Sequence, residues 1–180
     1  MKILKLVLSL TIISAACAAV LAAVNQVTRE QIEKIAAITR ENAAKAVMPA
    51  TVAKVEKREL KQGDATEDMY VGLDGSGKVL AYAVSGKSEK GYGGTVKLMV
   101  GLTPDRKVVS YRKLEANETP GLGAKLTTPE FSGQFGGKSA TGLKVKKDGG
   151  EIEAITAATI TSRAVCRAIE DARRNLAEAQ

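Results

Sequence analysis

The chain has 180 residues, a length that allows one domain with a substantial core plus a short additional segment. Its 27 lysines and arginines against 20 aspartates and glutamates give a net charge of +7, but no basic-aromatic motif accompanies the excess, and we expect no nucleic-acid partner. Histidine is absent, and the two cysteines, Cys17 and Cys166, lie far apart. This composition excludes Cys/His zinc sites, haem attachment and histidine-based catalysis, so we expect no metal. Any chemistry must use carboxylates, lysines, hydroxyls or a borrowed cofactor.

The N-terminal segment is a predicted membrane anchor. Residues 6–24 form an uninterrupted, uncharged and mostly aliphatic run, long enough to cross the roughly 30 Å hydrocarbon layer as a helix. Two lysines in residues 1–5 predict a cytoplasmic tail, which leaves the rest of the chain outside the cytoplasmic (inner) membrane. A cleaved secretory signal and a lipid on Cys17 are alternatives, although the apolar run continues past Cys17, which favours a membrane span.

Residues 25–50 are predicted to form a membrane-proximal segment. Thr28 and Gln31 have the spacing of a capping box, and apolar residues follow at helical spacing over about 28–47, until Pro49 ends the pattern. We interpret this helix as a spacer or a packing arm of the domain; a partner-binding helix is the alternative.

Residues 51–180 are predicted to form one α+β domain. Two β-hairpins are expected, one over 69–84 and one over 95–114, because short apolar strands flank tight-turn sequences there. Further strands are expected at 143–147 and 152–155, and an alanine-rich helix from about Thr161 closes the chain. Strands joined by tight turns imply an antiparallel sheet, with helices at both ends of the domain.

Two glycine-rich loops interrupt this pattern. The first, Gly91-Tyr92-Gly93-Gly94, leaves the backbone open to the close approach of a ligand, although a turn alone explains it more simply. The second spans 118–123 and reads Glu-Thr-Pro-Gly-Leu-Gly, in which the proline stiffens a loop that the glycines allow to fold tightly. A structural Ω loop is an equal alternative for this second stretch.

Residues 156–162, Thr-Ala-Ala-Thr-Ile-Thr-Ser, precede the last predicted helix. Hydroxyl side chains at this place satisfy free backbone N–H groups at a helix N-terminus, and one hydroxyl is enough for a cap. The surplus, together with two small alanines, also suits a phosphate, which the free N–H groups and the helix dipole favour. The Thr-x-x-Thr spacing allows either Thr156 or Thr159 to cap the helix.

These motifs, in this order after a membrane helix, resemble the covalent-FMN domain family, in particular the G subunit of the Rnf electron-transport complex. In that family a threonine in a motif similar to Asp-x-x-(Ser/Thr)-Gly-Ala-Thr is esterified to the FMN phosphate by a flavin transferase. Position by position, Thr159 stands at the attachment threonine and Thr156 at the hydroxyl residue. The resemblance thus makes Thr156 the better candidate for the cap and Thr159 for the bond to the phosphate. Glu153 replaces the family's Asp, and Ala157 replaces its Gly.

The resemblance implies covalent FMN on Thr159 and a pocket built by the three motifs. Tyr92, Thr119 and Leu122 would be the principal contacts of the isoalloxazine ring, and Lys125 is a candidate charge near it. The implied cofactor-binding set is Tyr92, Gly93, Gly94, Glu118, Thr119, Gly121, Leu122, Gly123, Lys125, Thr156, Ala157, Ala158, Ile160, Thr161 and Ser162.

The implied function is electron relay within a membrane complex that couples ferredoxin and NAD redox chemistry to Na⁺ or H⁺ movement. The flavin would supply the redox chemistry, so the chain would be a carrier and not an independent catalyst. The implied partners are the other subunits of the complex, the membrane and the flavin transferase. The C subunit of the Na⁺-translocating quinone reductase resembles the chain in the same motifs, and a membrane-anchored binding or assembly protein without flavin is the alternative from another class.

Overall fold

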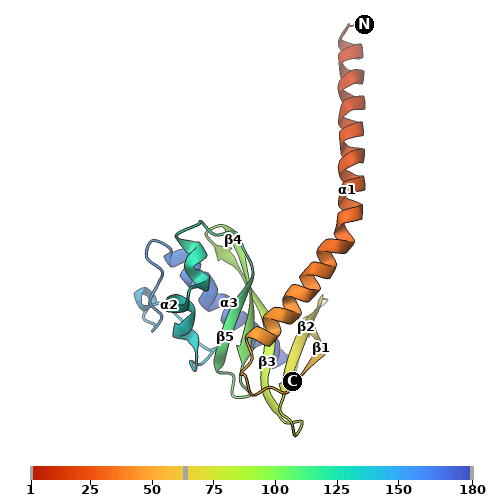
Figure 1. The fold of residues 1–180 in the computed structure, drawn as a ribbon. Helices are drawn as coiled ribbons and strands as arrows, with labels where there is room; N and C mark the ends of the chain where they lie inside the picture. The colour runs from red at the N-terminus through yellow and green to blue at the C-terminus, as the bar shows by residue number, and fades with distance from the viewer. Residues whose placement is uncertain (1, 63–64, 179–180) are drawn as a thin grey trace. The chain divides into compact units, whose positions relative to one another are not determined.

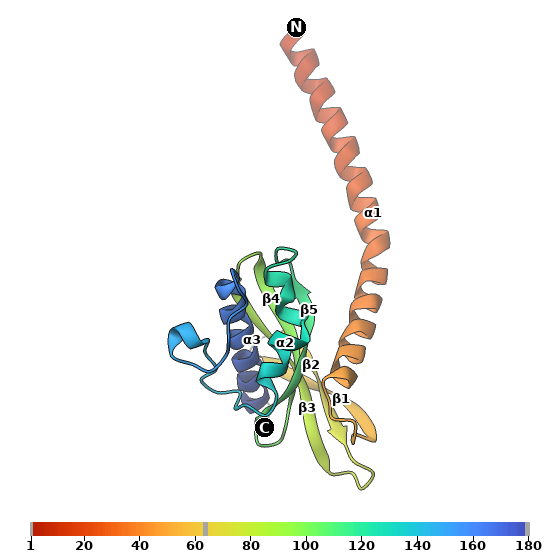
Figure 2. The same ribbon diagram turned by 60° about the vertical axis from the view of Figure 1, so that its left-hand side comes forward.

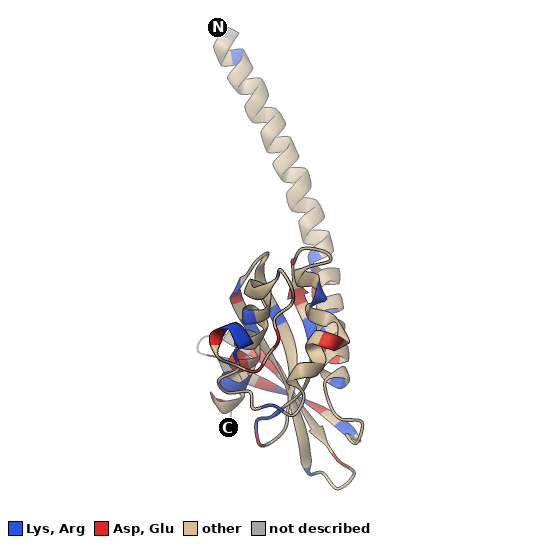
Figure 3. Ribbon diagram, turned by 90° about the vertical axis from the view of Figure 1, so that its left-hand side faces the viewer, with Lys and Arg blue, Asp and Glu red and all other residues tan. Residues whose placement is uncertain are grey.

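The computed structural model describes residues 2–62 and 65–178, which form two compact units, one through Thr39 and one from Arg40 onward. Helix α1 (Lys2–Ala46) has 45 residues, and its length through Thr39 makes up the first unit (Figure 1). Its most apolar window has a mean hydropathy of 2.4, and in the described chain it is the one helix long and apolar enough to cross a membrane. Charged residues are sparse toward the N-terminal end of α1, whereas both signs of charge are interspersed over the second unit (Figure 3). These features support the predicted membrane anchor.

The helix predicted over about 28–47 is present through Ala46, but it does not begin at Thr28, because it continues helix α1. No Gly or Pro lies between Lys2 and Ala46, so nothing interrupts the helix where the apolar run ends. The Thr28 hydroxyl donates to the carbonyl of Val24 one turn earlier, as threonine does inside a helix, instead of capping a new one. Arg29 and Glu33 form an exposed ion pair at 3.0 Å in the same region of the helix.

The second unit contains a five-stranded antiparallel sheet in the order β1-β2-β3-β4-β5. Its strands are β1 (Lys54–Gln62), β2 (Ala65–Leu73), β3 (Val79–Gly91), β4 (Gly94–Leu102) and β5 (Val108–Ala116). Both predicted hairpins are confirmed, since β2 pairs with β3 and β4 with β5. In the β2–β3 turn the Asp74 carboxylate accepts the Ser76 and Lys78 amides at 2.8 and 2.9 Å, and Gly77 takes the left-handed φ of 85° that the turn needs.

Helix α3 (Thr159–Glu178) covers one face of the sheet and closes the main core (Figure 2). The helix approaches β3 closely at Gly86, where a Cβ would lie 2.1 Å from the Ala168 carbonyl oxygen and 2.6 Å from the Ala172 nitrogen. On the other face, Ala43 and Ala44 in the last turn of α1, and Val47 just after it, are buried against the sheet. Helices therefore pack on both faces of an antiparallel sheet, which confirms the predicted α+β class.

The segment between β5 and α3 is mostly irregular. It contains three short 3₁₀ turns and one helical turn: η1 (Gly123–Thr127), α2 (Pro129–Ser132), η2 (Gly133–Phe135) and η3 (Lys146–Asp148). The prediction of strands at 143–147 and 152–155 is wrong, because the chain forms only an isolated parallel bridge between Val145 and Ile152 there. Both of these side chains are buried, so core packing explains the apolar signal that sequence reasoning assigned to strands.

Candidate functional site

A pocket of about 420 Å³ lies where the N-terminus of α3 meets two glycine-rich loops. Such a volume is within the range of small-molecule and cofactor sites. The structure thus brings together the three motifs singled out in the sequence, although they are far apart along the chain. The residues that line the pocket are Tyr92, Glu118, Thr119, Leu122, Gly123, Ala157, Ala158, Thr159, Ile160 and Thr161.

The first wall is the tight turn between β3 and β4. β3 ends at Gly91 and β4 begins at Gly94, so Tyr92 and Gly93 form the turn itself. A Cβ at Gly93 would lie 1.7 Å from the carbonyl oxygen of Asn117, so this position has no room for a side chain. Tyr92 is 71% exposed and lines the pocket, so its aromatic ring is available to contact a planar ligand.

The second wall is the loop over 118–123. Its backbone is folded tightly, because the Thr119 carbonyl accepts the amides of Leu122 at 3.2 Å and Ala124 at 3.1 Å. Gly121 has a φ of 76°, a conformation that glycine adopts without strain. Leu122 is 41% exposed at the pocket, so the loop presents an apolar side chain to a ligand.

The Glu118 carboxylate connects this loop to its two neighbours. One oxygen accepts the Gly93 amide at 3.3 Å, and the other accepts the Thr161 hydroxyl at 2.7 Å. Glu118 is only half-buried, but both of its carboxylate oxygens already have protein donors. The carboxylate is therefore part of the pocket's framework.

The third wall is the start of α3. The helix begins at Thr159, two residues before the predicted start, and its first internal backbone bond joins the Ser162 amide to the Ala158 carbonyl at 3.0 Å. The backbone N–H groups of residues 159–161 therefore lie before the first complete turn and have no acceptor within the described chain. Free N–H groups at the positive end of a helix dipole are suited to a phosphate.

Sequence reasoning missed the role of Ser162 at this helix start. Its hydroxyl accepts the Ile155 amide at 2.9 Å and donates to the Ala158 carbonyl at 3.0 Å, which fixes the preceding loop. Among the described residues, no hydrogen bond joins the Thr156 side chain to the helix, so the cap expected there is not formed. No sequence signal marks this difference, because Ser162 acts from inside the helix and not from the capping position.

The hydroxyl side chains of residues 156–162 differ in their exposure and in their hydrogen bonding. Thr161 is 1% exposed and bonded to Glu118, and Ser162 is fully buried with two partners. Thr156 is exposed but lines a separate groove of about 400 Å³, together with Lys125 and Glu153. Thr159 is half-buried in the wall of the pocket itself.

Several of the expected cofactor-binding residues are thus placed outside the lining of the pocket. Lys125 and Thr156 face the neighbouring groove, and Ser162 is buried beneath the helix start. Gly93, Gly94 and Gly121 shape the loops without lining the cavity. The other expected residues line it.

The charge of the lining is unusual for a phosphate site. Glu118 is the one charged side chain among the described lining residues, and no lysine or arginine is among them. The only positive potential that the lining offers is the helix N-terminus, a partial charge of roughly +0.5. Free N–H groups, small residues and the apolar Leu122 and Ile160 fit FMN, but the site lacks a side chain that would hold its phosphate as an ion pair.

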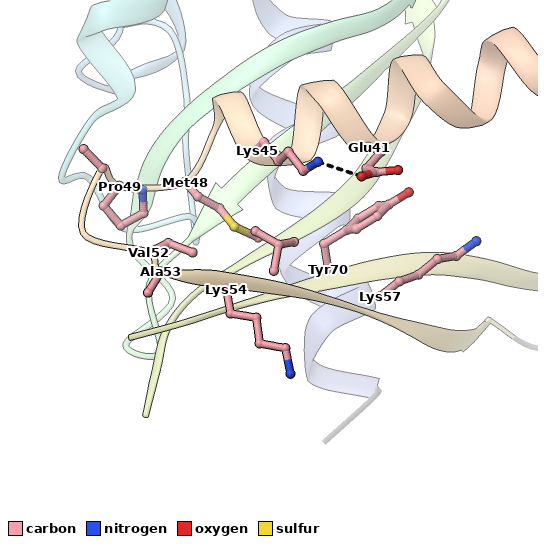
Figure 4. Close-up of a pocket in the computed structure, with 11 residues that line it drawn as sticks. Glu41, Lys45, Met48, Pro49, Val52, Ala53, Lys54, Lys57 and Tyr70 are labelled. Atoms are coloured by element: carbon pink, nitrogen blue, oxygen red, sulfur yellow. Dashed lines mark hydrogen bonds and ion pairs between the residues drawn. The ribbon is translucent and has the colours of Figure 1, made fainter. Parts of the chain in front are cut away.

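A larger groove of about 680 Å³ lies between the end of α1 and strands β1 and β2 (Figure 4). Lys45 and Glu41 form an ion pair at 2.7 Å on its rim, and Tyr70 forms part of its floor, where burial raises the pKa of the phenol. The groove holds none of the sequence-predicted site residues. Among the described residues, no group of three or more acidic or cysteine side chains could hold a metal. The smaller pocket is therefore the better candidate site.

Comparison with known proteins agrees with this choice. Residues 91–174, which include all three walls, match the FMN-binding domain family. The G subunit of the ion-translocating oxidoreductase complex of Methanosarcina acetivorans is 34% identical over 175 residues, covering 95% of this chain and 93% of that protein. The G subunit of the Na(+)-translocating ferredoxin:NAD(+) oxidoreductase complex of Acetobacterium woodii is 37% identical over 180 residues, covering 91% and 86%.

A solved structure shares the fold. The crystal structure of the C subunit of the Na(+)-translocating NADH-quinone reductase of Parabacteroides distasonis superimposes with a TM-score of 0.54 and is 20% identical, over 71% of this chain and 77% of that one. The identity to the G subunits is higher and extends over nearly the whole chain. The chain therefore belongs to the G-subunit family of ion-translocating oxidoreductase complexes, the Rnf type that its motifs resemble, and contains an FMN-binding domain.

Proposed function

We propose that this chain carries FMN through a phosphoester bond to the Thr159 hydroxyl and relays electrons within a membrane-bound, ion-translocating oxidoreductase complex. The observation that carries the proposal is the position of Thr159, which lies in the pocket wall at a helix N-terminus with unbonded N–H groups. When bound, FMN supplies the redox chemistry. The chain's own residues hold the phosphate, form the walls around the flavin ring and limit the access of water to the ring.

Thr159 is the preferred acceptor because the other hydroxyls are engaged or face elsewhere. Thr161 and Ser162 are buried and hydrogen-bonded, so modification of either would break existing bonds inside the core. Thr156 is exposed but faces a different groove. A phosphate on Thr159 would lie beside the free amides of residues 159–161, which is the favoured place for an anion.

A covalent bond also accounts for the charge of the pocket. Reversible phosphate sites commonly use lysine or arginine, because charge-assisted hydrogen bonds are about twice as strong as neutral ones. The described lining contains no such side chain, and a carboxylate, Glu118, is part of it. Attachment to Thr159 turns the phosphate monoester of FMN into a diester, which carries less negative charge and needs no ion pair to stay in place. We therefore expect the unmodified chain to bind free FMN weakly.

Ester formation requires an activated flavin nucleotide and a flavin transferase. The Thr159 oxygen forms the new bond to phosphorus while the phosphoanhydride bond of the donor breaks, and the other half of the donor leaves as a nucleoside monophosphate together with the threonine proton. The mass of the chain should rise by that of FMN less one water. Glu153 lies near this place in sequence and lines the neighbouring groove together with Thr156.

The relatives suggest the setting of this electron transfer. The Acetobacterium woodii relative is named as part of a Na⁺-translocating ferredoxin:NAD⁺ oxidoreductase complex, and we infer a comparable complex here, with Na⁺ or H⁺ as the coupling ion. The lysines that precede the apolar run of α1 favour a cytoplasmic N-terminus, so the FMN domain would be extracytoplasmic at the inner membrane. The chain would be an electron carrier that depends on neighbouring subunits.

The direct test is to express the full chain with and without a flavin transferase. Flavin fluorescence on a denaturing gel and the intact mass should show one FMN less water only when the transferase is present. Thr159→Val should abolish this label, while the control Thr156→Val should keep it. An unlabelled wild-type chain would favour a binding or assembly protein without flavin, and label that persists on Thr159→Val would move the attachment site.

A further inference from the structure

We propose that Glu118 is a positioning residue, a carboxylate brace that holds the two loop walls of the pocket against the turn of α3 that bears Thr159. This inference rests on the proposed function for the identity of the ligand, but the brace itself is a feature of the protein alone. Glu118 does not need to contact the flavin to act in this way. The Glu118 carboxylate would fix the distance between Thr159 and the two loops that form the walls around the flavin ring.

The brace consists of two hydrogen bonds that join three parts of the chain. The Gly93 amide donates to one carboxylate oxygen at 3.3 Å, and the Thr161 hydroxyl donates to the other at 2.7 Å. Thr161 is 1% exposed and belongs to the same helical turn as Thr159. The Gly93 turn, the Glu118 loop and the start of α3 are therefore connected through a single side chain.

Two glycines make the space that the carboxylate occupies. A Cβ at Gly91 would lie 2.7 Å from one carboxylate oxygen, and a Cβ at Gly123 would lie 2.5 Å from the other. Real Cβ atoms do not approach oxygen so closely, so any larger residue at either position would displace the brace. The glycines of both motifs thus have a second use beyond loop conformation, because they leave room for Glu118.

A carboxylate suits this geometry better than a neutral polar side chain, because hydrogen bonds to an ionised acceptor are stronger. Both oxygens act as acceptors, since an amide N–H and a hydroxyl donate to them. Glutamine can keep the Gly93 bond through its carbonyl oxygen, and its NH₂ group can bond Thr161 if that hydroxyl turns to accept, but both bonds then lose their charge assistance; alanine removes both. Glu118→Gln should therefore weaken the brace, and Glu118→Ala should abolish it.

The test compares the full chain with Glu118→Gln, Glu118→Ala and Glu115→Ala, all produced with the transferase. Glu115 is an exposed carboxylate on β5, so its removal makes the same change of charge without touching the brace. We expect equal flavin mass on all four chains, because Thr159 is unchanged. The Stern–Volmer constant for quenching of flavin fluorescence by acrylamide, a neutral quencher, should rise at least twofold in Glu118→Ala and less in Glu118→Gln, measured well below the unfolding temperature.

A loss of stability alone would not change quenching under these conditions, so the readout separates positioning from a structural role. Quenching in Glu118→Ala equal to that of the wild type would overturn the proposal. A second readout uses the chains made without flavin: hydrogen exchange of the peptide over 92–94 should become faster in both Glu118 variants but not in Glu115→Ala. If hydrogen exchange over 92–94 is unchanged in the Glu118 variants, the brace is refuted. If the wild-type chain carries no flavin but exchange is faster in the variants, only the flavin assignment is refuted.

Discussion

Ala157 offers a quantitative test of the loop that precedes the attachment helix. Its φ is 61°, in the left-handed region, where a residue with a Cβ is strained by roughly 1–2 kcal/mol. Ala157 is exposed, so replacing it with glycine removes no packing. The greater freedom of glycine in the unfolded chain offsets about 0.5–1 kcal/mol of the relief. Ala157→Gly should therefore stabilise the protein by about 1 kcal/mol and raise the unfolding temperature by roughly 2–6 °C.

The matched control is the next residue. Ala158 is 8% exposed, belongs to the main core and does not have a positive φ, so Ala158→Gly should lose both packing and backbone order. Thermal unfolding of the full chain in detergent, followed by near-ultraviolet circular dichroism of its tyrosines, would rank the two variants against the wild type. If Ala157→Gly is destabilised as much as Ala158→Gly, the left-handed loop is refuted.

Two further predictions concern the core and its pH dependence. Gly86→Ala should lower the free energy of unfolding by about 2–3 kcal/mol, because its Cβ would lie 2.1 Å from the Ala168 carbonyl oxygen. In the control Gly136→Ala the nearest atom is 3.6 Å away, so the free energy of unfolding should change by no more than about 0.5 kcal/mol. Urea denaturation measures both changes. Burial raises the pKa of the Cys166 thiol to about 12 from an ordinary 9.0, so the unfolded chain ionises first as pH rises. Above pH 9 the free energy of unfolding should fall by about 1.4 kcal/mol per pH unit more steeply in the wild type than in Cys166→Ala, up to the folded pKa. If the free energy of unfolding falls by the same amount in both chains between pH 8 and pH 10, the assignment is contradicted.

The fold could be predicted where local chemistry decides the structure. The β2–β3 turn is an example, since Asp74 and Gly77 satisfy the turn from within a few residues. β1 was not delimited in advance, because its Lys57, Arg58 and Glu59 replace the apolar alternation of a strand with the charges of an exposed sheet edge. The irregular segment around Val145 was mistaken for a strand for the opposite reason, because burial there follows tertiary packing and not a pleat.

The candidate site was predictable in its parts but not in its connections. The motifs indicated which segments bind a cofactor, and the structure brings those segments to one pocket. Which hydroxyl is free was not readable from the sequence, because Thr161 and Ser162 are engaged by partners that only the folded chain supplies. The same holds for the Glu118 brace, whose two donors lie 25 residues before it and 43 residues after it in the sequence. Residues that act through distant neighbours leave no local pattern.

The assembly of the pocket from distant segments has a consequence for the timing of maturation. Gly93 and Glu118 leave the ribosome well before α3, and a domain generally folds as a unit, so the fold is completed only when α3 is available. Until α3 packs against β3 at Gly86, Thr159 has no pocket, and Glu118 lacks one of its donors. A transferase that recognises the finished helix start would therefore modify only chains that have completed folding. Under the proposed function, flavin loading would act as a checkpoint on the quality of each newly made chain before it joins a complex.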